Sequence, residues 1–319
     1  MNKEKFLIMQ LGRFGDLILF TPIFRMIKEK FPGIELHLFA GRKNYEVVIG
    51  NPFIDKIIKF DKSPTKLLST LYQIRRNKYK YWIDPRDHFS KESRILAKIA
   101  RAEIKIGYNQ ENLKPVFDYN LKTVDRILHH SLIGINSLSN LNIELPKNPL
   151  KPELFFLNDE KFSIQSTEII NQFNNYILLN LSASGTHKMW EIDKWIEFIE
   201  QTKIYKQNLV VNFMESERNQ ANLIKDKFPS IILHNPSNIR DVMVLVAKSN
   251  IVISPDTSIV HIASAFNKKI FALYSGLDDF YTKFHPTSDK FTVVRAENGD
   301  KGIHSITITN AVENFLKNF

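Results

Sequence analysis

The sequence has no cysteine, which excludes disulfide bridges, thiol catalysis and cysteine-ligated metal sites. It also has no apolar run near the roughly 18 residues that a membrane-spanning helix needs. The first apolar run, residues 6–9, is too short for the core of a signal peptide. These absences predict a globular protein of a reducing, cytoplasmic compartment. At 319 residues the chain is long for a single core, so two domains are expected.

Acidic residues are scarce in one part of the chain. The net charge is +10, and residues 56–105 hold 14 Lys or Arg against 5 Asp or Glu, a surplus of +9. Such a segment is either a set of solvated helix faces or a surface for an acidic partner, such as nucleic acid, anionic lipid or a phosphorylated glycan. Composition alone does not separate these interpretations. Four of its basic residues, here called the basic quartet, are Arg75, Arg76, Lys78 and Lys80.

Strand-like and helix-like segments alternate along the chain. "KFLIMQLG" (5–12) and "IELHLFAG" (34–41) are typical of buried strands, and between them apolar residues recur at helical spacing. Residues 140–160 interrupt this pattern with Pro146, Pro149 and Pro152, and the alternation then begins again at "YILLNLSAS". The pattern predicts an α/β protein of two domains, residues 1–150 and 151–319, each with a parallel sheet covered by helices.

The stretch "LGRFGD", residues 11–16, follows the first predicted strand and precedes a helix. Gly12 and Gly15 allow a sharp turn and a close approach of the backbone to a ligand. Open parallel sheets bind ligands at the carboxyl ends of their strands, so Asp16 is a candidate functional carboxylate. The alternative is that Asp16 only caps the helix.

Two stretches of the second half have a similar form. In "SPDTSIVHIASAF" a strand runs into a hydroxyl-rich helix start, which suits a pyrophosphate. In "LNLSASGTHKMWEIDKW" a strand ends in small residues before a lysine, a phosphate-binding side chain. A packed histidine and an exposed loop lysine are the alternatives. The candidate residues are Ser184, Lys188, Asp256, Thr257, Ser258 and His261.

Together these stretches resemble the ADP-heptose:lipopolysaccharide heptosyltransferases of glycosyltransferase family 9. The blocks "NPFIDKII", "YWIDPRDHFSKESRILAKIARAEIKIGY" and "KMWEIDKW" are also similar to family blocks, in the family's order. The resemblance covers most of the chain, and the order and spacing of the blocks make it more specific than any single motif. Family members usually carry glycine where this chain has Ser258.

The resemblance implies a GT-B fold, in which two Rossmann-like domains carry parallel sheets. Residues 1–150 would bind the acceptor and residues 151–319 the nucleotide sugar. It implies an inverting transfer with no cofactor and no required metal, in which Asp16 acts as the general base. The implied donor-binding residues are Ser184, Lys188, Asp256, Thr257, Ser258, His261 and Glu217, with Glu215 as the alternative to Glu217. The implied acceptor-binding residues are Gly15, Asp84, Arg86 and the basic quartet.

The implied substrates are ADP-heptose and an acidic lipid A-core acceptor, Kdo-lipid A or a heptose on it. Such an acceptor lies on the inner face of the cytoplasmic membrane, so the protein is expected to be cytoplasmic and peripheral on that membrane, docked through the basic quartet. Two alternatives remain. One is a related nucleotide-sugar epimerase or hydrolase. The other is a nucleic-acid-binding protein, but no nucleic-acid-binding motif supports it, so no nucleic acid partner is expected.

Overall fold

The computed structural model describes residues 3–121 and 127–319. The chain forms two compact units, Met1–Leu157 and Asn158–Phe319. The division follows Leu157 rather than residue 150, because the segment after the prolines packs on the first unit. There the Glu153 carboxylate accepts a hydrogen bond of 2.8 Å from Arg25, and the Phe155 ring packs edge-on against Phe53.

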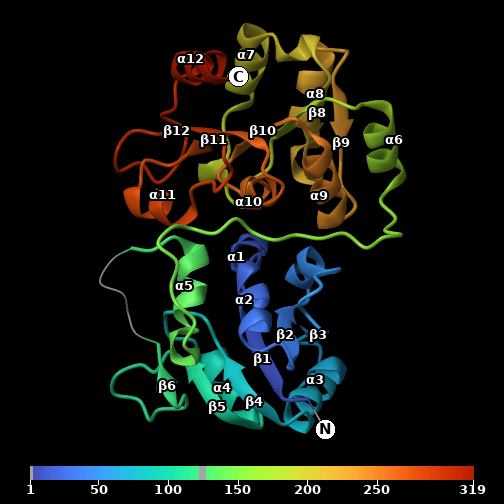
Figure 1. The fold of residues 1–319 in the computed structure, drawn as a ribbon. Helices are drawn as coiled ribbons and strands as arrows, with labels where there is room; N and C mark the ends of the chain where they lie inside the picture. Colours follow the sequence, from blue (N-terminus) through green and yellow to red (C-terminus); the bar gives the residue numbers. More distant parts are fainter. Residues whose placement is uncertain (1–2, 122–126) are drawn as a thin grey trace. The chain divides into compact units, whose positions relative to one another are not determined.

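The first unit is built on a sheet of six parallel strands in the order β3-β2-β1-β4-β5-β6 (Figure 1). Its strands are β1 (Lys5–Gln10), β2 (Glu35–Gly41), β3 (Lys56–Phe60), β4 (Tyr79–Ile83), β5 (Ala102–Gly107) and β6 (Tyr119–Asn120). Its helices are α1 (Phe14–Phe20), α2 (Pro22–Lys30), α3 (Pro64–Arg76), α4 (Lys91–Ile99) and α5 (His130–Asn136), with short 3₁₀ turns η1 (Asn44–Val48) and η2 (Ser139–Leu141).

Alternate residues of β1 serve two different layers of the first unit. Leu7 and Met9 belong to a buried cluster that includes Ile74 of α3 and Leu96 of α4, so these two helices cover one face of the sheet. The apolar stretch that follows the loop at Gly12 forms two helices, α1 and α2, rather than one. Pro22 starts α2 at the position where a missing N–H costs nothing, directly after α1 ends.

The second unit repeats this architecture, with six parallel strands in the order β12-β11-β10-β7-β8-β9. Its strands are β7 (Ile177–Asn180), β8 (Leu209–Asn212), β9 (Ile232–His234), β10 (Ile251–Pro255), β11 (Lys269–Tyr274) and β12 (Phe291–Arg295). Its α-helices are α6 (Ile164–Gln172), α7 (Ile192–Thr202), α8 (Arg218–Lys227), α9 (Ile239–Lys248), α10 (Ser258–Ala265), α11 (Asp278–Phe284) and α12 (Ile308–Asn318). Its 3₁₀ turns are η3 (Thr186–Lys188), η4 (Ile204–Lys206) and η5 (Glu215–Glu217).

The α/β fold class with two parallel sheets is therefore confirmed. One face of the second sheet packs on α7, α8 and α12 in a cluster centred on Trp195, Phe198 and Phe315. Within residues 3–121 and 127–319, no helix is long and apolar enough to cross a membrane. Every strand of a parallel sheet ends at the same edge, so each unit has one carboxyl edge on which loop side chains gather.

Candidate functional site

Asp16 lies in the first turn of α1, just beyond the end of β1. Its Oδ2 accepts a hydrogen bond of 2.9 Å from the backbone N–H of Arg13, so the carboxylate does cap the helix. A Cβ on Gly12 would come within 2.6 Å of the same oxygen, which explains the glycine. Gly15 precedes Asp16 in the same turn. The Asp16 side chain is 30% exposed, so its carboxylate is also open to solvent.

A histidine that the sequence analysis did not single out lies beside Asp16. His130 begins α5, and its Nε2 is 3.7 Å from Asp16 Oδ1. Helix α5 packs against α1, and Gly134 makes this possible because a Cβ there would collide with the ring of Phe20. The approach of these helices, visible in Figure 1, is what brings the imidazole to the carboxylate.

Asp84 and Arg86 lie at the same edge of the first sheet as Asp16. They follow β4, which pairs directly with β1. The Asp84 carboxylate accepts two hydrogen bonds of 3.0 Å from the Arg86 guanidinium and a third from the Ser93 hydroxyl. Asp84 is buried, whereas Arg86 keeps 20% of its side chain exposed. Asp84 therefore holds Arg86 in place, and Arg86 is the partner that faces solvent.

The structure does not bring the basic quartet together with Asp16. Arg75 and Arg76 end α3, Lys78 precedes β4, and Lys80 is paired with Glu4, just before β1. These positions mark the amino edge of the first sheet. At about 3.3 Å per residue, the six residues of β1 separate this edge from the Asp16 loop by roughly 20 Å.

Two predicted donor-binding side chains meet in the second unit. Lys188 Nζ donates a hydrogen bond of 2.6 Å to Asp256 Oδ2, although the residues belong to different loops. The Lys188 side chain is 17% exposed and that of Asp256 is 8% exposed. The pair joins the loop after β7 to the loop after β10. A cation held in this way is preorganised for a phosphate.

The helix start next to this pair has the form that the sequence predicted. Thr257 caps α10 by accepting a hydrogen bond of 3.3 Å from the Ile259 N–H, and Ser258 is the first helical residue. His261 lies one turn further along, buried, with its ring 6.3 Å from that of Phe284. The hydroxyls of Thr257 and Ser258 and the Lys188 ammonium form a set that suits a diphosphate at a helix N-terminus.

The structure places the two candidate glutamates differently. Glu217 is buried, and its carboxylate accepts hydrogen bonds from the hydroxyls of Ser182 and Ser216. Glu215 is exposed and forms an ion pair with Arg218. Glu217 therefore lies against the loop that carries Lys188, whereas Glu215 points to solvent. Ser184 is exposed on that loop.

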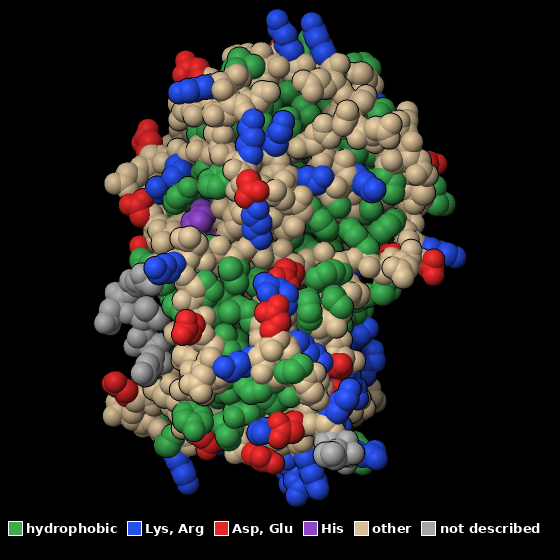
Figure 2. All heavy atoms as spheres, viewed as in Figure 1, with side chains coloured by type: hydrophobic (Ala, Val, Ile, Leu, Met, Phe, Trp, Pro, Cys, Tyr) green, Lys and Arg blue, Asp and Glu red, His purple; other side chains and the backbone are tan. Residues whose placement is uncertain are grey.

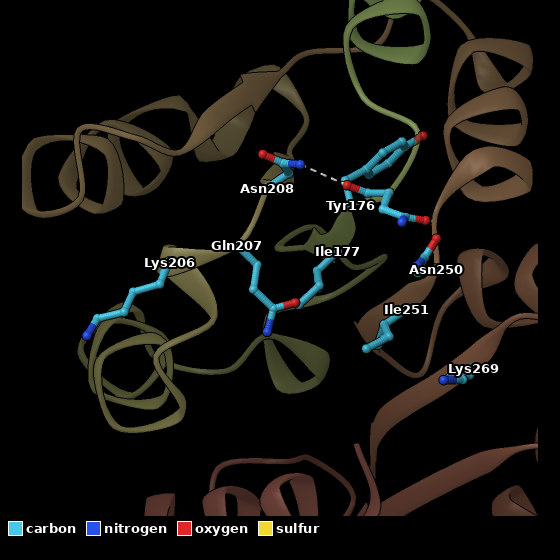
Figure 3. A pocket seen from close by; sticks show the side chains of 9 residues that line it. Tyr176, Ile177, Lys206, Gln207, Asn208, Asn250, Ile251 and Lys269 are labelled. Atoms are coloured by element: carbon cyan, nitrogen blue, oxygen red, sulfur yellow. Dashed lines mark hydrogen bonds between the residues drawn. The ribbon is translucent and has the colours of Figure 1, made fainter.

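Polar side chains also line a cavity of about 300 Å³ in the second unit (Figure 3). Its lining includes Ile177, Ile251 and Lys269, the first residues of β7, β10 and β11. It therefore lies at the amino edge of the second sheet, away from the loops that carry Lys188 and Asp256. Among the described residues, no cluster of His, Cys, Asp or Glu has the composition of a metal site.

Comparison with known proteins identifies the family. Residues 68–310 match glycosyltransferase family 9 (heptosyltransferase). The chain belongs to this family. It is 24% identical over 306 residues to the lipopolysaccharide core heptosyltransferase OpsX of Haemophilus influenzae, covering 92% of this chain and 85% of the relative.

Solved structures of this family share the fold. A family 9 glycosyltransferase from Veillonella parvula superposes with a TM-score of 0.82 at 15% identity, covering 98% of this chain and 96% of that structure. The Escherichia coli heptosyltransferase WaaC with ADP superposes with a TM-score of 0.77 at 14% identity, covering 98% and 99%. The chain is thus a GT-B glycosyltransferase related to the lipopolysaccharide core heptosyltransferases.

Proposed function

We propose that this glycosyltransferase transfers a heptose from ADP-heptose to the inner core of lipopolysaccharide, with inversion at the anomeric carbon. The observation that carries the donor half is the Lys188–Asp256 pair beside the start of α10. As the glycosidic bond breaks, negative charge grows on the diphosphate. The Lys188 ammonium, the N–H groups of α10 and His261 would stabilise that charge without a metal ion. Glu217 would accept hydrogen bonds from hydroxyls of the nucleoside.

Asp16 is the proposed general base. Inversion requires the acceptor hydroxyl to attack from the side opposite the leaving diphosphate and to lose its proton as the bond forms. The Asp16 carboxylate is held by the Arg13 N–H and remains partly exposed, so it can take that proton. Gly15 precedes it in the same turn, and Arg86 offers a cation for an acidic acceptor at the same edge of the first sheet.

The basic quartet is proposed to dock the enzyme on an anionic membrane rather than to touch the reacting hydroxyl. Its place at the amino edge, away from the Asp16 loop, supports this role. Helix α3 also presents Leu68 and Tyr72 to solvent, 73% and 63% exposed. Lys and Arg side chains crowd this part of the first unit in Figure 2. Each basic residue near an anionic surface contributes about 1 kcal/mol.

The decisive experiment combines a donor with an acceptor. We expect the purified enzyme to transfer heptose from ADP-heptose to Kdo-lipid A, and Asp16→Asn to reduce kcat about 10²- to 10⁴-fold while ADP binding is retained. Product stereochemistry by NMR tests inversion. Release of free sugar without an acceptor would favour a hydrolase, and a folded Asp16→Asn variant with wild-type turnover would restrict Asp16 to capping α1.

A further inference from the structure

A row of polar side chains crosses the second sheet behind the donor loops. It consists of the last residues of three strands, Asn180 of β7, Asn212 of β8 and His234 of β9, together with Ser254 of β10. Asn180 pairs in register with Asn212, and Asn212 with His234, so these side chains project from the same face of the sheet. All are at most 2% exposed.

Hydrogen bonds run along the row without a gap. His234 Nδ1 is 2.8 Å from Asn212 Oδ1, and Asn212 Nδ2 donates to Asn180 Oδ1 at 3.1 Å. Asn180 Nδ2 donates to the Ser254 hydroxyl at 3.1 Å. At the far end, the Ser166 hydroxyl of α6 is 2.9 Å from His234 Nε2. Buried polar groups would be costly without these partners.

One backbone carbonyl fixes the direction of every bond in the row. Asn180 Nδ2 also donates to the carbonyl of Ser182 at 2.8 Å, and a carbonyl only accepts. The Asn180 amide oxygen must therefore face Asn212, and the Asn212 NH₂ group must donate a hydrogen bond to it. The Asn212 oxygen then requires an N–H from His234, so the proton of the neutral imidazole is on Nδ1 and Nε2 accepts from Ser166.

The row touches both donor loops. Through the Ser182 carbonyl it holds the loop that leads to Lys188. Through Ser254, whose hydroxyl is 3.1 Å from that of Thr257, it holds the loop that starts α10. The Ser182 hydroxyl in turn accepts from the Met214 N–H at 2.7 Å and donates to Glu217. None of Asn180, Asn212 and His234 is needed to contact a ligand directly.

We propose that Asn180, Asn212 and His234 are positioning residues that set the geometry of the two donor loops and thereby the affinity for the donor's diphosphate. This inference rests on the proposed donor site. A buried hydrogen-bond network with a purely structural role would affect the stability of the fold but not the affinity for the donor.

The test compares Asn212→Leu with a matched control on the same strand. Val210 lies two residues earlier on the same face, is fully buried and has no side-chain hydrogen bond to lose, so Val210→Ala destabilises the sheet without touching the row. Binding is measured by calorimetry with whichever of ADP, UDP and GDP the wild type binds most tightly. We expect Asn212→Leu to raise that Kd about tenfold, the effect of roughly one net hydrogen bond, and Val210→Ala to leave it unchanged.

A second pair of variants probes the far end of the row. The Nδ2 of His234→Asn takes the place of the imidazole Nδ1–H, whereas His234→Leu supplies no donor. We expect the Asn variant to retain wild-type Kd and the Leu variant to weaken binding. If Asn212→Leu does not fold, this pair of variants still tests whether the row affects the affinity for the nucleoside diphosphate.

The outcomes separate the inference from the proposed function. A folded Asn212→Leu variant with wild-type Kd, equal weakening by Val210→Ala, or equal Kd values for the two His234 variants would overturn the role of the row. A wild type that binds no nucleoside diphosphate would instead overturn the proposed donor site, and the inference with it.

Discussion

Lowering the pH from 7 to 5 should destabilise this protein through His234. Its imidazole is fully buried, accepts a hydrogen bond at Nε2 and lies among neutral amides, and burial lowers its pKa from 6.5 to about 4. The nearby Asp241 carboxylate raises the pKa by a smaller amount. Between these two pKa values the unfolded chain binds a proton that the folded chain does not, so stability falls as the pH falls.

The size of this effect follows from the two pKa values. His234 has a pKa of 6.5 in the unfolded chain and of about 4 in the folded chain. At pH 7 its titration changes the free energy of unfolding very little, because the imidazole is mostly neutral in both the folded and the unfolded chain. At pH 5 the unfolded histidine is charged and the folded one is not. The difference amounts to about 2 kcal/mol of lost stability between pH 7 and pH 5, and about 3 kcal/mol below pH 4.

The assay is urea unfolding followed by tryptophan fluorescence at both pH values. Two of the three tryptophans, Trp190 and Trp195, are buried in the second unit, so the signal reports mainly on the unit that contains His234. His37 in the first unit also has a pKa lowered by burial, and it is present in every sample. His234→Asn retains the amide-facing donor but does not titrate. The wild type should lose about 2 kcal/mol more than this variant, and equal losses would refute the reasoning.

Two further predictions concern the substrates. Lys188→Ala and His261→Ala should each raise the Kd for the nucleoside diphosphate about tenfold or more and leave acceptor affinity unchanged, because charged hydrogen bonds to the diphosphate are lost. Calorimetry checks this against Lys194→Ala, the removal of a partly exposed lysine on α7, and an unchanged Kd in both variants would contradict the assignment. Replacing the basic quartet with glutamine should raise the acceptor KM, weaken binding to anionic liposomes and spare the donor KM. The wild-type acceptor KM should rise with salt. If neither change alters acceptor kinetics, the quartet is a solvated face.

The sequence predicts the course of the fold well, because apolar periodicity and glycine-rich breaks are local signals. The strand ends before Asp16 and Asp256 can be located in the sequence, and their loops therefore fall at carboxyl edges. The position of a residue before or after a strand also locates the basic quartet, at the amino edge of the first sheet. Lys78 precedes β4 and Arg86 follows it, so they belong to opposite edges of the first sheet.

Contacts between distant segments are where the sequence falls short. His130 reaches Asp16 only because two helices pack closely at Gly134, and nothing in the residues around His130 signals that approach. The pairing of Lys188 with Asp256 likewise depends on the order of strands in the sheet. In that order β7 and β10 are neighbours, although β8 and β9 lie between them along the chain. Strand order is a property of the whole sheet rather than of either loop.

The buried amides point to a common construction behind both candidate sites. In the first unit, Asn44 donates to the carbonyls of Gln10 and Gly12 at 3.1 and 2.8 Å, and so holds the loop that leads to Asp16. In the second unit, Asn180 does the same for the carbonyl of Ser182. A carbonyl in a loop that leaves a sheet has no strand partner, and a buried side-chain amide satisfies it while restricting the loop to one path. Loops that carry the chemistry can then be rich in glycine and serine and still be ordered, because their geometry is set from the sheet beneath them.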